Sequence, residues 1–398
     1  MVTRASAPAA DRPGTGAAGR PGAAGLACRG CGTAARQVVD LGARPASDDF
    51  PALDAPGPDP VWPLQLWHCP DCALVQLGPV RALLPEPVRA VESATSREHA
   101  RRIAAAVLAD HPQLAGRTVR EFASHHGGSW LAALAEHGCR QAAGGEPAAL
   151  VVDAHALAHD PDVHGCLAER AAALADDGLL VIEHHHLLPL VTQGQFDTVR
   201  HGHWSYLSLT AIHRLAGRHG LRVVDAVPEP VFGGSLRVVL AHAAAEHPVT
   251  RRVPQLLARE DAAGLADGSG LESFAVRAGE SARLLHGYLA DARAAGRRVL
   301  GYGAPSKAAV LLGLAGVGPD LLEFTVDAAP LKHGRAIPAG TGGRVPIRPV
   351  AELTAARPAE VLLLTWDIAD EVVAQLESAG GWGARYLLPL PAPREYRT

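Results

Sequence analysis

Two histidines separated by a single residue, His201 and His203, directly follow Arg200 in the segment Gln195–Leu209. An imidazole titrates near neutral pH and can take or return a proton, and a guanidinium beside it can stabilise the negative charge that forms. The segment lies between a strand-like apolar run and a predicted helix. Open α/β sheets hold their reactive groups in such connections. We therefore take this segment as the candidate active site.

Four cysteines near the N-terminus form two Cys-x-x-Cys pairs: Cys28, Cys31, Cys69 and Cys72. Four thiolates in this pattern are typical of a closed tetrahedral Zn²⁺ site. The stretch between the two pairs is longer than in a usual zinc ribbon, and disulfides or free thiols are the alternatives. Disulfides are disfavoured in a cytosolic chain. We predict one structural zinc.

Composition limits the class of protein. The chain has 398 residues, 48% hydrophobic and 20% charged, which predicts a soluble globular protein of two or three domains. No apolar run reaches the ~18 residues of a membrane span. The net charge of -4 gives no reason to expect nucleic-acid binding. Residues 1–25, rich in Ala, Gly and Pro, lack the apolar core of a signal peptide, so we expect a disordered tail and a cytoplasmic protein.

The candidate segment resembles the active-site signature of the nucleotide-deoxysugar C-methyltransferases, Gln-Phe-Asp-x-Ile-Tyr-His-Glu-His-x-x-Tyr-x-Ser-Leu. The matching residues are Gln195, Phe196, Asp197, His201, His203, Tyr206, Ser208 and Leu209. The Tyr and Glu of the signature are replaced by Arg200 and Gly202. The resemblance implies that His203 removes a proton beside a ketone and that Tyr206 contacts the sugar. The matched His201 joins the candidate catalytic group. Because Gly202 replaces the glutamate that could have oriented the imidazole, His159 and Arg200 are the candidates to take over, His159 as a hydrogen-bond partner and Arg200 as the cation that stabilises an enolate oxygen.

The resemblance extends over nearly all of residues 26–392 and implies an α/β protein. Its expected parts are a zinc-binding N-terminal module, a class I methyltransferase-like doubly wound domain, a helical connection and a C-terminal Rossmann-like domain. After the tail, these parts are expected at residues 26–82, 83–245, 246–297 and 298–398.

The family writes its S-adenosylmethionine loop as Glu-Ile-Gly-Ser-Asn-Asp-Gly, and this chain keeps Glu121, Ser124 and Gly127. We predict that these three residues meet the cofactor. Ala123 replaces a glycine of that loop, and two histidines follow Ser124. The next predicted strand begins only about a dozen residues after the following helix, where a βαβ unit takes roughly 30 residues. The family places there the acidic residue that holds the cofactor ribose, so S-adenosylmethionine use is in doubt.

Both lysines of the chain, Lys307 and Lys332, lie in the C-terminal domain, although the chain has 37 cationic residues. Lys307 follows a strand and a Gly-x-Gly turn that opens a helix, which alone is a weak phosphate-loop signal. Retained lysines in an arginine-using chain indicate that a compact charge is needed. The alternative is two solvated surface lysines. We predict that both bind a nucleotide-linked sugar.

Histidines are common in the loops expected at one edge of the sheet: His125, His126, His155, His159, His184, His185, His186, His201 and His203. One or two could transfer protons, three convergent ones could bind a metal, and in this chain without asparagine they could simply be polar loop residues. Two classes of function follow. The first is an enzyme that deprotonates a dTDP-linked keto-deoxysugar through His203 and then methylates the enolate, or reprotonates it as an epimerase. The second is a non-catalytic nucleotide-sugar-binding partner.

Overall fold

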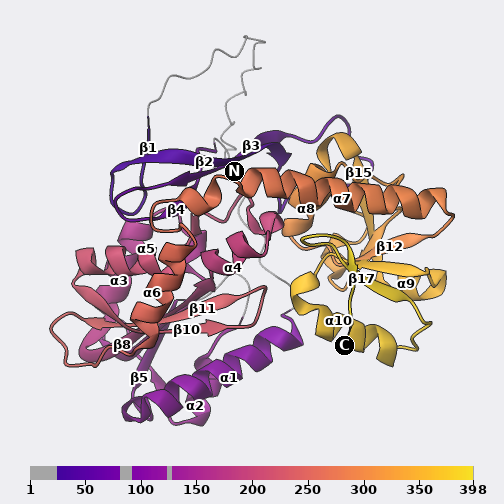
Figure 1. The fold of residues 1–398 in the computed structure, drawn as a ribbon. Coiled ribbons are helices and arrows are strands. Elements are labelled where there is room, and N and C mark those ends of the chain that lie inside the picture. The colour runs from indigo at the N-terminus through magenta and orange to yellow at the C-terminus, as the bar shows by residue number, and fades with distance from the viewer. Residues whose placement is uncertain (1–24, 81–91, 123–127, 398) are drawn as a thin grey trace, which may run out of the picture.

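The computed structural model describes residues 25–80, 92–122 and 128–397, which form three β-sheets with helices packed around them (Figure 1). The predicted tail therefore lies almost wholly outside the described residues, and so does the turn 123–127 with Ser124 and Gly127. None of the described helices combines the length and the apolar character needed to cross a membrane. The α/β fold class is confirmed.

The first sheet is antiparallel and contains the cysteine pairs. Its strands, in spatial order, are β1 (Leu26–Ala27), β2 (Ala34–Pro45), β3 (Val61–His68), β4 (Val75–Leu77) and β9 (Ser205–Tyr206). The edge strand β9 comes from the candidate active-site segment, more than a hundred residues further along the chain than β4. The N-terminal module and the middle domain consequently share one sheet.

The second sheet has the order β10-β11-β8-β7-β5-β6, with a parallel centre and an antiparallel end. Its longer strands are β5 (Thr118–Phe122), β7 (Ala148–Ala154), β8 (Leu174–His185), β10 (Leu221–Glu229) and β11 (Ser235–His242). The apolar runs in β7 and β8 are buried on both faces, which is why these strands are continuous in Val and Leu rather than alternating. The doubly wound middle domain is confirmed.

Helices pack against this sheet, and the loops that leave its strands end where these helices begin. They are α1 (Ala94–Asp110), α2 (Leu131–Glu136), α3 (Val163–Ala173), α4 (Leu187–Thr192) and α5 (Leu209–Ala216). The hydroxyl of Ser93 accepts the Ser96 amide at the start of α1, and Ser208 does the same for Ala211 at the start of α5. The candidate segment therefore ends at a capped helix.

The outer edge of this sheet is short. Strand β6 (Arg140–Gln141) pairs with β5 at the edge, and residues 142–147 lead from it directly into β7 without a helix. The predicted loss of most of one βαβ unit is confirmed.

The chain continues through α6 (Arg252–Ala262) and the long α7 (Phe274–Ala294) into a third sheet. In spatial order its strands are β14 (Ala336–Pro338), β15 (Arg344–Pro349), β13 (Thr325–Asp327), β12 (Val299–Tyr302), β16 (Glu360–Leu363), β17 (Arg385–Leu388) and β18 (Arg394–Glu395). The five inner strands are parallel, as in a Rossmann-like domain. Its helices are α8 (Lys307–Ala315), α9 (Val350–Ala356) and α10 (Ala369–Ser378).

Candidate active site and zinc centre

A cavity of about 160 Å³ lies between the middle domain and the C-terminal domain. The ends of β7 and β8 supply one part of its lining, the candidate segment a second, and the start of α8 a third. The charged and titratable residues that line it include His155, Glu183, His185, Arg200, His203 and Lys307. The structure thus brings His203, Arg200 and Lys307 to one cavity.

His203 is 2% exposed, and within the described residues neither ring nitrogen has a hydrogen-bond partner. Its ring centroid lies 4.9 Å from that of His159, 4.6 Å from that of Tyr206 and 6.1 Å from that of His185. Burial, together with the nearby His159 and Arg200, holds the pKa of His203 well below its usual range. The imidazole is therefore neutral at pH 7 and can accept a proton.

Arg200 is buried, and its Nη1 donates to Asp48 Oδ2 at 3.3 Å. The other carboxylate oxygen of Asp48, which lies between β2 and β3, accepts the hydroxyl of Ser306. Asp48 thus joins the N-terminal module, the candidate segment and the C-terminal domain at the cavity. Gly202, two residues after Arg200, has a φ of +86°, a conformation in which the glutamate of the family signature would be strained.

His201 lies outside the cavity lining. Its Nε2 is 3.2 Å from the carbonyl oxygen of Pro63, and its ring packs edge-on against Trp62. The predicted catalytic role of His201 is therefore not supported, because the ring is directed into β3.

Tyr206 has a structural function in this loop. Its hydroxyl accepts the amide of Arg200 at 2.9 Å and donates to the Arg200 carbonyl at 3.3 Å, while its ring packs against His203. The residue is 1% exposed and does not line the cavity. In this structure Tyr206 supports the loop that carries His203, and its contact with a sugar stays a prediction.

The two lysines have different environments. Lys307 lines the cavity, pairs with Asp367 at 2.5 Å and lies 4.1 Å from the centroid of the Trp366 ring. Lys332 donates to the carbonyl oxygen of Ala304 at 2.8 Å and is not part of the lining. Only Lys307 is placed to meet a ligand in this cavity.

Trp366 also anchors the candidate segment, because its Nε1 donates to Asp197 Oδ2 at 2.7 Å. Asp197 is fully buried. Burial raises the pKa of this carboxyl to about 6, although the positive charge of Lys307 and the bond from Trp366 act in the opposite direction.

Of the residues predicted to meet S-adenosylmethionine, only Glu121 is among the described residues. Its two carboxylate oxygens accept the Trp130 amide and the Ser129 hydroxyl, each at 2.6 Å, so Glu121 fixes the start of α2. At the end of β6 the next two residues are alanines, and Glu146 beyond them is paired with Arg140 at 2.5 Å. Among the described residues that follow β6, the first acidic side chain is therefore already paired with a cation.

Sequence reasoning assigned no chemistry to Glu183 and His99. Both are buried, both line the cavity, and they are hydrogen-bonded to each other. The signal in the sequence was a glutamate directly after the apolar run Leu179–Ile182 of β8, since a buried carboxylate needs partners.

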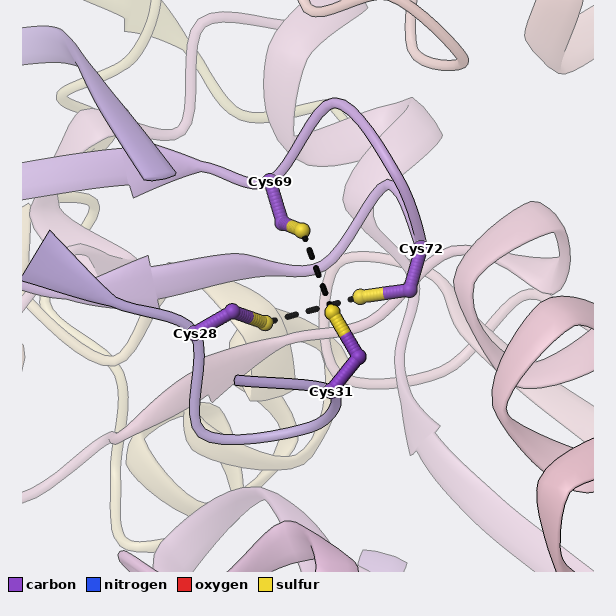
Figure 2. Close-up of side chains that lie close together, drawn as sticks. All are labelled: Cys28, Cys31, Cys69 and Cys72. Atoms are coloured by element: carbon purple, nitrogen blue, oxygen red, sulfur yellow. Dashed lines mark hydrogen bonds between the residues drawn. The ribbon is translucent and has the colours of Figure 1, made fainter. Parts of the chain in front are cut away.

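The four N-terminal cysteines converge, with all sulfur atoms within 4.8 Å of one another (Figure 2). The Cys28 and Cys72 sulfurs are 3.5 Å apart and those of Cys31 and Cys69 3.4 Å, well beyond the ~2.05 Å of a disulfide bond. The hydrogen bond to Cys28 and burial raise the pKa of Cys72, so four thiolates can coexist only with a cation. The donor set fits tetrahedral Zn²⁺.

No other group of ligands among the described residues converges closely enough to hold a metal ion. The cavity histidines are therefore not a metal site within the part of the chain that the structure describes.

The zinc knuckle contacts the active-site loop. The guanidinium of Arg29 lies 4.6 Å from the centroid of the Trp204 ring and donates to the Leu77 carbonyl at 2.6 Å. The Leu77 amide in turn donates to the Trp204 carbonyl at 2.9 Å. Since Trp204 is the neighbour of His203, the cysteine cluster helps to position this histidine.

Comparison with known proteins agrees with these features. Residues 230–391 match a family model described as "C-methyltransferase C-terminal domain", and residues 28–82 match one described as "Putative zinc binding domain". C-methyltransferase NovU from Streptomyces niveus is 38% identical over 252 residues, which cover 62% of this chain and 58% of that protein. The chain thus spans less than two thirds of the length of this curated relative.

Solved structures are more distant. The Burkholderia thailandensis 1,6-didemethyltoxoflavin-N1-methyltransferase, with bound S-adenosylhomocysteine, is 17% identical, with 44% of this chain and 97% of that chain covered at a TM-score of 0.31. TnmH is 24% identical, with 36% and 47% covered at a TM-score of 0.26. These similarities are too low to carry an argument. In its two matched domains and in its similarity to the curated relative, this chain resembles the C-methyltransferases.

Proposed function

We propose that this chain binds a keto-deoxysugar linked to dTDP in the cavity, and that His203 removes the proton beside the ketone. The observation that carries the proposal is the state of His203: buried, neutral, lining the cavity and without a hydrogen-bond partner among the described residues. A neutral imidazole with an available nitrogen is the form that a general base requires.

Arg200 and His159 complete this part of the site. The guanidinium of Arg200 lines the cavity and is held by Asp48, so its charge is fixed before an enolate oxygen forms. His159 packs edge-on against His203 and restricts the orientation of its ring. The covalent bond between the α-carbon and its hydrogen breaks, and the proton goes to His203. The electron pair of that bond forms the enolate.

Lys307 is the residue that we propose for the diphosphate. It occupies the first position of α8, where the helix dipole favours an anion, and it faces the same cavity as His203. Its pairing with Asp367 keeps the charge compensated until a ligand enters.

Similarity to the C-methyltransferases favours S-adenosylmethionine as the methyl donor, which would supply an electrophilic methyl group to the enolate carbon. The described residues at β6 lack the acid that would hold its ribose, so we expect loose binding. The same shortened edge favours a second candidate function, in which the enolate is reprotonated without a methyl donor. Both candidates share the deprotonation by His203.

Incubation with dTDP-4-keto-deoxysugars in deuterium oxide tests that shared step. Loss of the α-proton signal is expected for the unmutated chain. His203→Gln should slow it by about 10²–10⁴-fold, the usual contribution of a general base. His213→Gln, on the exposed face of α5, is the matched control. If the unmutated chain binds dTDP but exchanges no proton on any of these sugars, it is a non-catalytic nucleotide-sugar-binding protein instead.

A further inference from the structure

Glu183 is a buried carboxylate that directly follows an apolar run in β8. It is 1% exposed, it follows Leu180, Val181 and Ile182 in β8, and it lines the cavity. An unpaired charge in such a place would destabilise the fold, because burial removes the water that solvates it. The structure around it must therefore stabilise the anion.

Two imidazoles provide that stabilisation. His99 on α1 is hydrogen-bonded through Nε2 to Glu183 Oε1, and Nε2 of His155, after β7, lies 3.6 Å from the same oxygen. Burial alone would raise the pKa of Glu183, but the two imidazoles outweigh it and hold the pKa well below its usual range. The carboxylate is ionised at neutral pH.

The two histidines are not equivalent. Arg102 Nη2 is 3.0 Å from Nδ1 of His99, and because a guanidinium can only donate, that nitrogen accepts and Nε2 carries the hydrogen that goes to Glu183. His99 can therefore serve Glu183 as a neutral donor. The negative charge of Glu183 can therefore stabilise a positive charge on His155.

His155 is held against Glu183 by its backbone. Its φ is +63°, a left-handed conformation that is strained for a non-glycine residue, and its amide donates to the Glu183 carbonyl at 2.7 Å. The ring lies 5.2 Å from that of His185 and 5.8 Å from that of Phe232, centroid to centroid. Strain of this kind persists where the surroundings fix a side chain in one position. Here that position lies between a buried anion and the cavity.

We propose that His155, backed by Glu183, is a general acid that protonates the ketone oxygen while His203 removes the α-proton. The inference rests on the proposed function. The electron pair of the broken carbon–hydrogen bond forms the carbon–carbon double bond, and the carbonyl oxygen takes the proton of the His155 imidazolium. His203 becomes the imidazolium, the product is the enol, and the reverse transfer restores both residues without another reactant.

The environments of the two imidazoles match these opposite roles. His203 has cationic neighbours, Arg200 and His159, which favour its neutral form. His155 has a buried carboxylate beside it, and a carboxylate stabilises an imidazolium in the way that the aspartate of a catalytic triad does. Two titratable groups in one cavity with opposed surroundings are a typical acid and base pair. Glu183 and His99 are positioning residues, since they act through His155.

The test measures α-proton exchange in deuterium oxide with a dTDP-4-keto-deoxysugar, giving kcat and KM separately. His155→Gln should lower kcat about 10²-fold and leave KM within about threefold, as expected for loss of a general acid. Glu183→Gln should lower kcat by about tenfold or more. His164→Gln, on the exposed start of α3, is the control and should match the unmutated chain. Added imidazole should restore part of the exchange lost in His155→Ala, which loss of structure alone would not allow.

Exchange by His155→Gln at the unmutated rate would overturn the inference while leaving the role of His203 intact. No exchange by the unmutated chain would instead remove the proposed function on which the inference rests. If Glu183→Gln does not fold, His155→Gln and the imidazole rescue still decide the question.

Discussion

Two regions of the molecule depart from the family pattern, with different structural results. One is the loop Gln195–Leu209 around His203, here called the corner, and the other is the edge of the middle sheet formed by β6 and residues 142–147. At the corner, β9 pairs with β4, Asp48 binds Arg200 and Trp366 binds Asp197, so all three domains hold the loop. At the edge, β6 is two residues long and Glu121 bonds only to the turn that follows β5. The corner is therefore bonded to all three domains, whereas the edge lacks part of the expected βαβ unit.

The difference shows how a changed motif residue can be interpreted. At the corner, the arginine that replaces a tyrosine has a carboxylate partner in Asp48, and the glycine that replaces a glutamate occupies a left-handed turn. The structure accommodates each replacement, the arginine through an ion pair and the glycine through its backbone conformation. At the edge, no described acidic residue takes over the ribose, because the element that would carry it is missing. Replacement with a partner preserves a site, whereas loss of an element removes one.

The largest expected effect comes from removing the metal that the corner depends on. Chelation, or Cys72→Ser, should release zinc and free β9 from β4, so that α-proton exchange is lost together with the fold of the N-terminal sheet. Apparent zinc-binding energies of about 10–16 kcal/mol in small thiolate sites exceed the stability of most domains. Zinc content, exchange activity and amide protection at Leu77 and Tyr206 are the measurements.

Cys139→Ser is the matched control, because Cys139 is a buried free cysteine outside the cluster. It should keep one zinc and full exchange. A chelated chain that still exchanges the α-proton would show that the corner is not coupled to the cysteines.

A smaller effect is expected from Asp197, the buried carboxyl that ties the corner to Trp366. Its pKa in the folded chain is about 6, above the usual ~3.9, so the folded state binds this proton more tightly than the unfolded state. The carboxyl therefore stabilises the fold at low pH, and the stabilisation is lost as the pH rises from about 4 to above 6. Two pKa units correspond to about 3 kcal/mol.

Asp197→Asn removes this titration. Urea unfolding of both proteins should show the variant gaining about 3 kcal/mol relative to the unmutated chain between pH 4 and pH 7.5. Taking the difference cancels the other titrating groups. A difference in unfolding free energy that stays constant with pH would mean that Asp197 is ionised throughout.

Much of this architecture could be predicted because short stretches of sequence determine it. The Cys-x-x-Cys pairs, the apolar strands and the short interval before β7 each lie within one stretch of sequence. The pairing of β9 could not be predicted, because two residues carry no strand pattern and their partner is over a hundred residues away. Likewise His201 matched the signature, yet its direction was decided by the Pro63 carbonyl in another module. Glu183 was visible in sequence, but its histidine partners come from two other elements.

The reduced edge gives the next prediction. Without an acid for the ribose, S-adenosylhomocysteine should bind about 1–3 kcal/mol more weakly than to a complete site, moving a micromolar dissociation constant toward 100 µM or above. Glu121→Gln should change it by less than about threefold, since both oxygens of Glu121 already have partners in the chain. Calorimetry measures both. Binding tighter than about 10 µM would show that this edge still holds the cofactor.

The smallest effect is expected from Asp48→Asn, which keeps the shape of the corner and removes one charge. Asp48 Oδ2 accepts from Arg200 and its other oxygen accepts from Ser306, so the amide preserves an acceptor but weakens the hold on the guanidinium. A loss of about 1 kcal/mol would lower kcat/KM for exchange about fivefold.

Asp49→Asn places the same change one residue away and should leave exchange unaltered. Arg200 is also held through its backbone by the Tyr206 hydroxyl, so the loop itself should stay in place and zinc content should not change. If Asp48→Asn instead abolished exchange, the carboxylate would be as essential as the base. The corner would then depend on one ion pair and not on the combined contacts of three domains.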